Sequence, residues 1–237
     1  LFLGEKMSEI NELIYKLQNK RKEPSYPKRI KSLKSQGMQT EIIEEGVAKV
    51  AETISRGIKS FVIYGEPQSG KTEVMIALAC KIVDLGFETI FVVMNDNTEL
   101  ENQNYQRFIE ANELNPSPMR DYQLFNLENS QLKQKKTRII FCRKNSKNLQ
   151  KLIENSRYMA KRVIIDDEAD FASVDTNINK TNKDATAINS ALSKLGNLDV
   201  KNEEDRGIYI GVTATPGRLD LNNTFRNIAI WALIGFL

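Results

Sequence analysis

The sequence contains no histidine. Imidazole is the side chain that most often serves as a proton relay near neutral pH, and it is a common ligand of zinc. Metal sites and proton relays that need imidazole are therefore excluded. Any chemistry that this chain performs must use carboxylates, lysine, arginine, hydroxyl groups and the backbone.

Cysteine and long apolar segments are also scarce. The chain has 2 cysteines, Cys80 and Cys142, and both stand among apolar neighbours, so no disulfide framework is indicated. No apolar run approaches the ~20 residues that cross a bilayer, and the opening LFLGEKMSEI has no hydrophobic segment typical of a secretory signal. We therefore expect a cytoplasmic protein with no membrane partner.

Charge is nearly balanced overall but unevenly distributed. The formal net charge is +3, yet lysine and arginine crowd the stretch from Lys133 to Arg162, where Glu154 is almost the sole acid. A second basic run extends from Lys20 to Lys34. Such runs are usually solvated surface, and the alternative is a footprint for the phosphate backbone of nucleic acid.

Apolar strands alternate with helices along most of the chain. Strands are expected at 61–64, 89–94, 138–142, 162–166 and 208–214, and helices at 71–85, 98–114, 148–160 and 185–195. This alternation predicts an α/β fold with a parallel sheet covered by helices on both faces.

The N-terminal part has a different character. Helical spacing recurs over 8–20 and again over 38–56, whereas 21–37 contains Pro24, Pro27 and many charges and is typical of a linker. We therefore expect an N-terminal helix and basic linker over 1–37, followed by one α/β lobe over 38–237.

The segment GEPQSGKT matches the phosphate-loop pattern G-x-x-x-x-G-K-[ST] at every position, and it stands between an expected strand and an expected helix. Its backbone would wrap a phosphate at a helix N-terminus. Lys71 would reach the β- and γ-phosphates and Thr72 would hold Mg²⁺. The alternative is a chance match within a turn. The residues expected to bind nucleotide are Gly65, Glu66, Pro67, Gln68, Ser69, Gly70, Lys71 and Thr72.

A phosphate loop needs a carboxylate at the end of a neighbouring strand, and VIIDDEAD, Val163 to Asp170, supplies several. One carboxylate would bind Mg²⁺ and another would orient and deprotonate the attacking water. ATP and Mg²⁺ are the expected cofactors. A third segment, GVTATPG, places Thr213 and Thr215 at the end of another expected strand. It is either a polar strand cap or a relay between the nucleotide and a bound polymer.

In the order GxxxxGKT, DEAD and T-A-T, the chain resembles the first motor lobe of a superfamily-two helicase of the DEAD or DExH type. The resemblance implies a RecA-like P-loop NTPase lobe with three catalytic residues: Lys71 binds phosphate, Asp167 holds Mg²⁺ and Glu168 is the general base. Asp170 and either Thr213 or Thr215 would couple hydrolysis to motion. The preceding Asp166 leaves the register open by one residue, so Asp166 and Asp167 could exchange roles.

A narrower resemblance covers roughly Gln39 to Arg218. The phrases IIDDEADFASVDTN, AINSALSKL and YIGVTATP are similar to the Z-one domain, a helicase-like ATPase domain of bacterial and phage proteins associated with restriction, antiviral defence and endonucleases. The complete motor of this class has a second lobe with an arginine finger, for which the residues after Thr215 leave no room. The lobe alone is therefore expected to bind ATP better than it hydrolyses it, and no nuclease constellation stands out.

Two polar segments follow expected strands, and the matching segments of such motor lobes contact the backbone of one nucleic-acid strand. The candidates are Asn95, Asn97, Arg143, Lys144 and Asn145. For each asparagine, capping of the following helix is an equally good interpretation.

These observations favour an ATP-hydrolysing motor lobe that acts on nucleic acid, with DNA as the expected polymer and a nuclease or other defence subunit as the expected protein partner. An ATP-sensing module that recruits such a partner without motor action is the main alternative. A small-molecule kinase and a terminase-type packaging motor share parts of the pattern.

Overall fold

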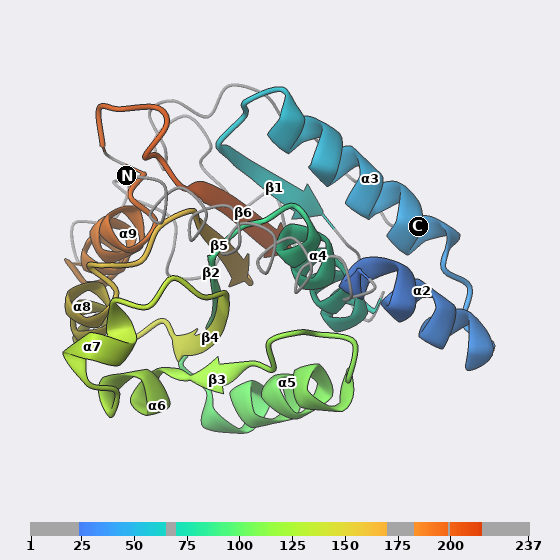
Figure 1. Cartoon of the computed structure of the whole chain (residues 1–237), viewed down its shortest axis with the longest axis horizontal. Coiled ribbons are helices and arrows are strands. Elements are labelled where there is room, and N and C mark those ends of the chain that lie inside the picture. The colour runs from blue at the N-terminus through green and yellow to red at the C-terminus, as the bar shows by residue number, and fades with distance from the viewer. Residues whose placement is uncertain (1–23, 65–69, 170–182, 199, 215–237) are drawn as a thin grey trace, which may run out of the picture.

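The computed structural model describes residues 24–64, 70–169, 183–198 and 200–214 (Figure 1). The expected helix over 8–20, the loop residues 65–69, and Asp170 and Thr215 lie outside the described residues.

A parallel β-sheet forms the centre of the molecule. Its six strands are β1 (Ser60–Tyr64), β2 (Thr89–Met94), β3 (Met119–Arg120), β4 (Arg138–Arg143), β5 (Arg162–Asp167) and β6 (Ile208–Thr213). They lie in the order β1-β6-β5-β2-β4-β3, and every neighbouring pair is parallel. The prediction of an α/β fold is confirmed.

Helices cover both faces of this sheet (Figure 1). The first face carries α2 (Ser25–Ser35), α3 (Glu41–Ser55), α4 (Lys71–Asp84) and α5 (Thr98–Glu110). The second face carries α6 (Asp121–Phe125), α7 (Asn129–Leu132), α8 (Ser146–Asn155) and α9 (Lys183–Leu195). Each face has its own apolar core, as the alternating sides of buried parallel strands require.

The alternation along β5 decides the geometry of the site. Val163 and Ile165 pack into the core beneath α4, whereas Ile164 packs into the core beneath α8 and α9. Because successive side chains of a strand point to opposite faces, Asp167 continues the first set and Asp166 continues the second.

The predicted linker over 21–37 is wrong for Ser25–Ser35, which forms α2 and packs on α4. Leu33 is fully buried, and the Asp84 carboxylate accepts hydrogen bonds from the Ser25 and Tyr26 amides, each at 2.8 Å. The two prolines misled the prediction because they lie at the N-cap and in the first turn, where a helix tolerates proline.

Arg29 fastens α2 to the rest of the first face. This buried guanidinium pairs with Glu73 in the first turn of α4 and with Glu113 after α5, the latter at 3.2 Å. The extension before α3 is therefore part of the lobe from Ser25 onward.

The remaining differences from the predictions concern the ends of two helices and several short elements. Helix α5 ends at Glu110 and not at 114, and α8 runs from Ser146 to Asn155 and not from 148 to 160. The elements β3, α6 and α7 were not predicted, because two to five residues are too few to show a period.

We predict that Leu33→Ala lowers the free energy of unfolding by roughly 2–5 kcal/mol, because it leaves a cavity beneath α2. The matched control Lys31→Ala changes an exposed residue of the same helix and should shift it by less than about 0.5 kcal/mol. Urea denaturation of both variants measures the difference. Equal stability of the two would contradict the packing of α2 described above.

Candidate nucleotide and nucleic-acid site

Polar residues gather where the parallel strands end. Strand β6 lies between β1 and β5, so the ends of β1, β6 and β5 are adjacent. Ligands of open α/β sheets bind beyond the carboxyl ends of the strands. The phosphate-loop segment, the acidic segment and Thr213 therefore share one edge of the sheet.

The phosphate-loop segment is described from Gly70 onward. Gly70 has a left-handed backbone, with φ of 78°, and forms the N-cap of α4, with its carbonyl accepting from the Glu73 amide at 2.8 Å. Lys71 and Thr72 occupy the first turn of α4, where backbone N–H groups have no partner inside the helix. This helix start fits phosphate binding. Gly65, Glu66, Pro67, Gln68 and Ser69 lie outside the described residues.

The Thr72 hydroxyl contacts two side chains of α5. It donates to Asn104 Oδ1 at 3.0 Å and accepts from Arg107 Nη1 at 3.4 Å. A hydroxyl has one hydrogen and two lone pairs, so donation to Asn104 leaves its oxygen able to bind a cation. Sequence reasoning missed both partners, although they belong to the amide-rich stretch ENQNYQR.

Asp167 is the carboxylate that shares a face with α4. Burial raises its pKa to about 6, and the charge of Lys71 opposes this rise. Among the described residues, no group of three or more acidic or cysteine side chains could hold a metal ion by itself. Phosphoryl-transfer sites bind Mg²⁺ through one or two protein ligands together with phosphates and water.

Asp166 lies on the opposite face and is fully buried. Its carboxylate accepts from the Tyr209 hydroxyl at 2.6 Å and pairs with the Lys144 ammonium at 2.9 Å. This placement argues against the predicted metal role of Asp166. It also argues against a direct polymer contact by Lys144, whose side chain is 1% exposed.

Glu168 is held by two residues that the sequence suggested for nucleic acid. Asn95 Nδ2 donates to the Glu168 carboxylate, and Lys144 Nζ donates to the Glu168 carbonyl at 2.8 Å. Glu168 itself has a positive φ of 50°, which is unusual for a residue other than glycine. Lys144 thus contacts the candidate base, and so does Asn95.

Ala169 packs so closely against β6 that no side chain fits between them. Its amide donates to the Val212 carbonyl at 3.0 Å. A Cβ atom built on Gly211 would lie 2.9 Å from the Ala169 Cβ and 3.2 Å from Val62 Cγ2. The acidic segment is thereby packed on the strand that ends in Thr213, which is itself buried.

The two candidate asparagines at helix starts are N-caps, as the alternative interpretation proposed. Asn97 Oδ1 accepts from the Glu99 and Leu100 amides at 3.0 and 3.2 Å. Asn145 Oδ1 accepts from the Lys147 and Asn148 amides at 3.1 and 3.4 Å. Capping leaves the amide nitrogen of each side chain for other partners, and that of Asn145 donates to Asp96 Oδ2 at 3.1 Å.

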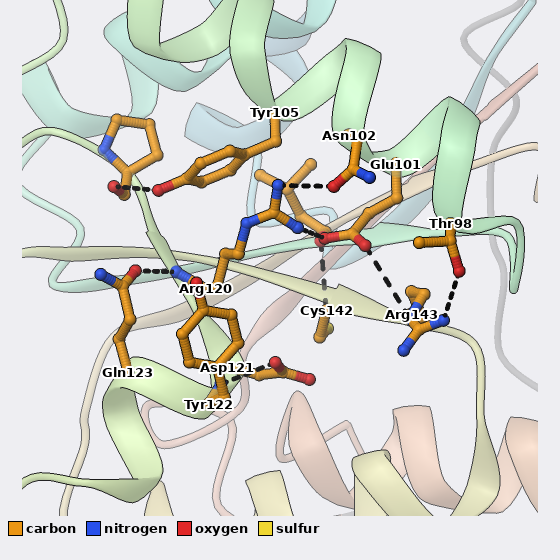
Figure 2. A network of polar contacts seen from close by, with 12 residues as sticks. Thr98, Glu101, Asn102, Tyr105, Arg120, Asp121, Tyr122, Gln123, Cys142 and Arg143 are labelled. Atoms are coloured by element: carbon orange, nitrogen blue, oxygen red, sulfur yellow. Dashed lines mark hydrogen bonds and ion pairs between the residues drawn. The ribbon is translucent and has the colours of Figure 1, made fainter.

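Arg143 belongs to the polar network of Figure 2. Its guanidinium donates to Thr98 Oγ1 at 3.0 Å and lies 3.4 Å from Asp96 and 3.8 Å from Glu101. Its side chain is 34% exposed, so a polymer could still reach it.

Arg120 completes this network from β3. It pairs with Glu101 at 2.6 Å, donates to Asn102 Oδ1 at 2.8 Å and stacks on Tyr105 with 4.1 Å to the ring centre (Figure 2). Burial raises the pKa of Glu101, and the charges of Arg120 and Arg143 oppose the rise. The network joins the start of α5 to the ends of β3 and β4.

Residues 32–218, well over half of the chain, match the family described as "Type III restriction enzyme, res subunit". The chain belongs to this restriction-enzyme family. The match supports the helicase-like assignment and leaves the narrower Z-one resemblance a hypothesis.

Two solved structures show the same fold. The helicase domain of Hef from Pyrococcus furiosus has a TM-score of 0.50 and 14% identity over 84% of this chain. The DUF1998 helicase MrfA bound to DNA has a TM-score of 0.56 and 12% identity over 88% of this chain. The alignments cover 40% and 29% of those proteins, respectively. The chain therefore shares the RecA-like α/β fold of these two domains. No curated protein matches the sequence, and no described helix is long and apolar enough to cross a membrane.

The raised pKa of Asp167 predicts a pH-dependent stability. The folded chain holds this proton up to about pH 6, whereas the unfolded chain releases it near pH 3.8, the ordinary pKa of an aspartate. The group therefore stabilises the fold below its unfolded pKa, and this contribution is lost as the pH rises through its folded pKa.

We expect the free energy of unfolding of the ligand-free chain to fall by on the order of 1–3 kcal/mol across that window, relative to Asp167→Asn. Urea denaturation at a series of pH values measures this difference. Parallel pH profiles for the wild type and Asp167→Asn would refute it.

Proposed function

We propose that the chain binds ATP with Mg²⁺ as the first lobe of a motor that acts on DNA. The observation that carries the proposal is the placement of Lys71 and Asp167 on one face, at the edge where β1 and β5 end. A cation at the start of a helix and a partly buried carboxylate are the two groups that a phosphoryl-transfer site needs.

In this proposal each residue of the site has a role that follows from its position. The loop Gly65–Thr72 and Lys71 bind the phosphates, while Thr72 and Asp167 hold Mg²⁺, which neutralises charge on the phosphates when bound. Glu168 orients a water molecule for in-line attack on the γ-phosphate and accepts its proton. Asn95 holds the Glu168 carboxylate and so orients it.

Coupling to motion is assigned to the segments that continue from this site. Asp170 and Thr215 follow the described ends of the acidic segment and of β6, and Thr213 ends β6 itself. The contact of Ala169 with β6 supports the idea that these two segments move together.

The polymer face is proposed along the ends of β2 and β4. Arg143 is the partly exposed cation there, and the capping residues Asn97 and Asn145 flank it. The DNA in the MrfA structure supports DNA as the polymer. The family name supports a role in restriction. As partner we propose a nuclease or another defence subunit, in the cytoplasm.

A second lobe would supply the arginine finger, so the first lobe alone should bind ATP better than it hydrolyses it. The main alternative is an ATP-sensing module without motor action. It is supported by the ion pairs that Lys144 forms with Asp166 and that Arg143 forms with Asp96, because both cations already have partners inside the protein. That alternative expects ATP binding that DNA does not affect.

In a protein that carries both lobes, we predict that Glu168→Gln lowers DNA-stimulated ATP hydrolysis by about 10²–10⁴-fold while ATP binding persists, because only the proton acceptor is removed. Steady-state hydrolysis and ATP titration measure the two properties. The matched control Glu154→Gln alters an exposed acid of α8 and should leave both unchanged. ATP binding without DNA stimulation in the wild-type protein with both lobes would instead favour the sensing module.

For DNA, we predict that Arg143→Gln weakens single-stranded DNA binding regardless of sequence and reduces the magnitude of the salt slope by about one. Binding titrations at several salt concentrations measure the slope. Arg157→Gln removes an exposed cation at the far end of α8 and serves as the control. A loss in Arg157→Gln alone would move the DNA site to that basic end.

A further inference from the structure

We infer that Lys144 is a positioning residue that holds the segment Asp167–Ala169 and connects it to the end of β4. The inference rests on the proposed role of Glu168 as the base. It gives a function to a buried cation that the nucleotide chemistry does not use.

The Lys144 ammonium contacts oxygens of both Asp166 and Glu168 inside the described part of the protein. It lies 2.9 Å from Asp166 Oδ1 and 2.8 Å from the carbonyl oxygen of Glu168. Its side chain is 1% exposed and that of Asp166 is 0% exposed, so neither charge is screened by water. The Tyr209 hydroxyl occupies the other Asp166 oxygen at 2.6 Å.

Stability alone does not explain this pair. Removing two charges from water is expensive, and well-packed apolar residues often stabilise a core as much as a buried ion pair does. What the ion pair provides here is a donor at a fixed place. Asp166, itself fixed by Tyr209, holds the ammonium against the Glu168 carbonyl.

The Glu168 backbone needs such a restraint. Its φ of 50° is a left-handed conformation, which is unfavourable in a residue with a side chain. Lys144 binds the carbonyl of the following peptide, and the Ala169 amide of the same peptide donates to Val212. That peptide is thus held at both of its polar groups.

Lys144 also lies directly beside the proposed polymer face, although its own side chain is buried. It follows β4 directly, between Arg143 and Asn145, and its own amide donates to the Met94 carbonyl at 2.8 Å. Strand β2 separates β4 from β5, so the side chain reaches across β2 to the acidic segment. A shift of this strand end on binding DNA would act on the Glu168 carbonyl through one side chain.

The decisive comparison is between Lys144→Met and the double variant Lys144→Met/Asp166→Asn. The single variant leaves a buried carboxylate without its cation and should unfold more easily. The double variant removes both charges and should recover the melting temperature. If Lys144 positions Glu168, kcat for ATP hydrolysis stays about 10–100-fold low in the double variant while KM for ATP stays close to the wild-type value.

Lys147→Met changes an exposed lysine three positions along and is the matched control, expected to behave as the wild type. Lys144→Arg keeps the charge beside Asp166 but cannot place one nitrogen between two oxygens in the same way. Should the double variant fail to fold, Lys144→Arg decides the question, with a several-fold lower kcat expected at wild-type stability. Wild-type kcat in a stable double variant, or in Lys144→Arg, would overturn the inference.

Hydrogen exchange at the Ala169 amide separates this inference from the proposed function. Faster exchange in the double variant than in the wild type supports positioning by Lys144 even if the chain hydrolyses no ATP, a result that would remove only the role of Glu168 as base. Unchanged exchange at Ala169 would overturn the inference whatever the hydrolysis rate.

Discussion

The alternation of side chains along β5 is the constraint on which the candidate site depends. Two adjacent aspartates at the end of one strand must point to opposite faces of the sheet. Asp167 therefore shares a face with α4 and Lys71, whereas Asp166 turns toward Lys144 and Tyr209. The Asp167 carboxylate is therefore the candidate for binding Mg²⁺, and the Asp166 carboxylate has a structural role. The sequence alone does not distinguish the two.

The order of the strands determines which residues surround the acidic end of β5. Because β5 has β6 on one side and β2 on the other, its acidic end meets the ends of both. Asn95 approaches Glu168 from β2, the Ala169 amide bonds to β6, and Lys144 reaches in from β4. The candidate base is thus contacted from three strands, which is how a parallel sheet can bring distant segments to bear on one residue.

Motifs and periodicity predicted the fold well, and they are also the source of the proposed nucleotide face, because both depend on local signals. The loop Gly65–Thr72, the buried strands and the acidic strand end are each recognisable within a few residues. The choice between Asp166 and Asp167, the partners of Thr72, and the burial of Lys144 depend on which strands become neighbours, and no local pattern records that. Helix α2 was missed for a different reason, since its prolines fit a helix start as well as a linker.

The close approach of Ala169 to Gly211 indicates that the residues of the DEAD motif are required for different physical reasons. Charge explains the aspartate and the glutamate, but the alanine is explained by its size, since even a methyl group on Gly211 would collide with it. Neither residue can grow while the other stays as it is. A larger residue at position 169 or 211 would have to move β6 away from the acidic segment, so natural variation at these two positions should be restricted jointly and not one at a time.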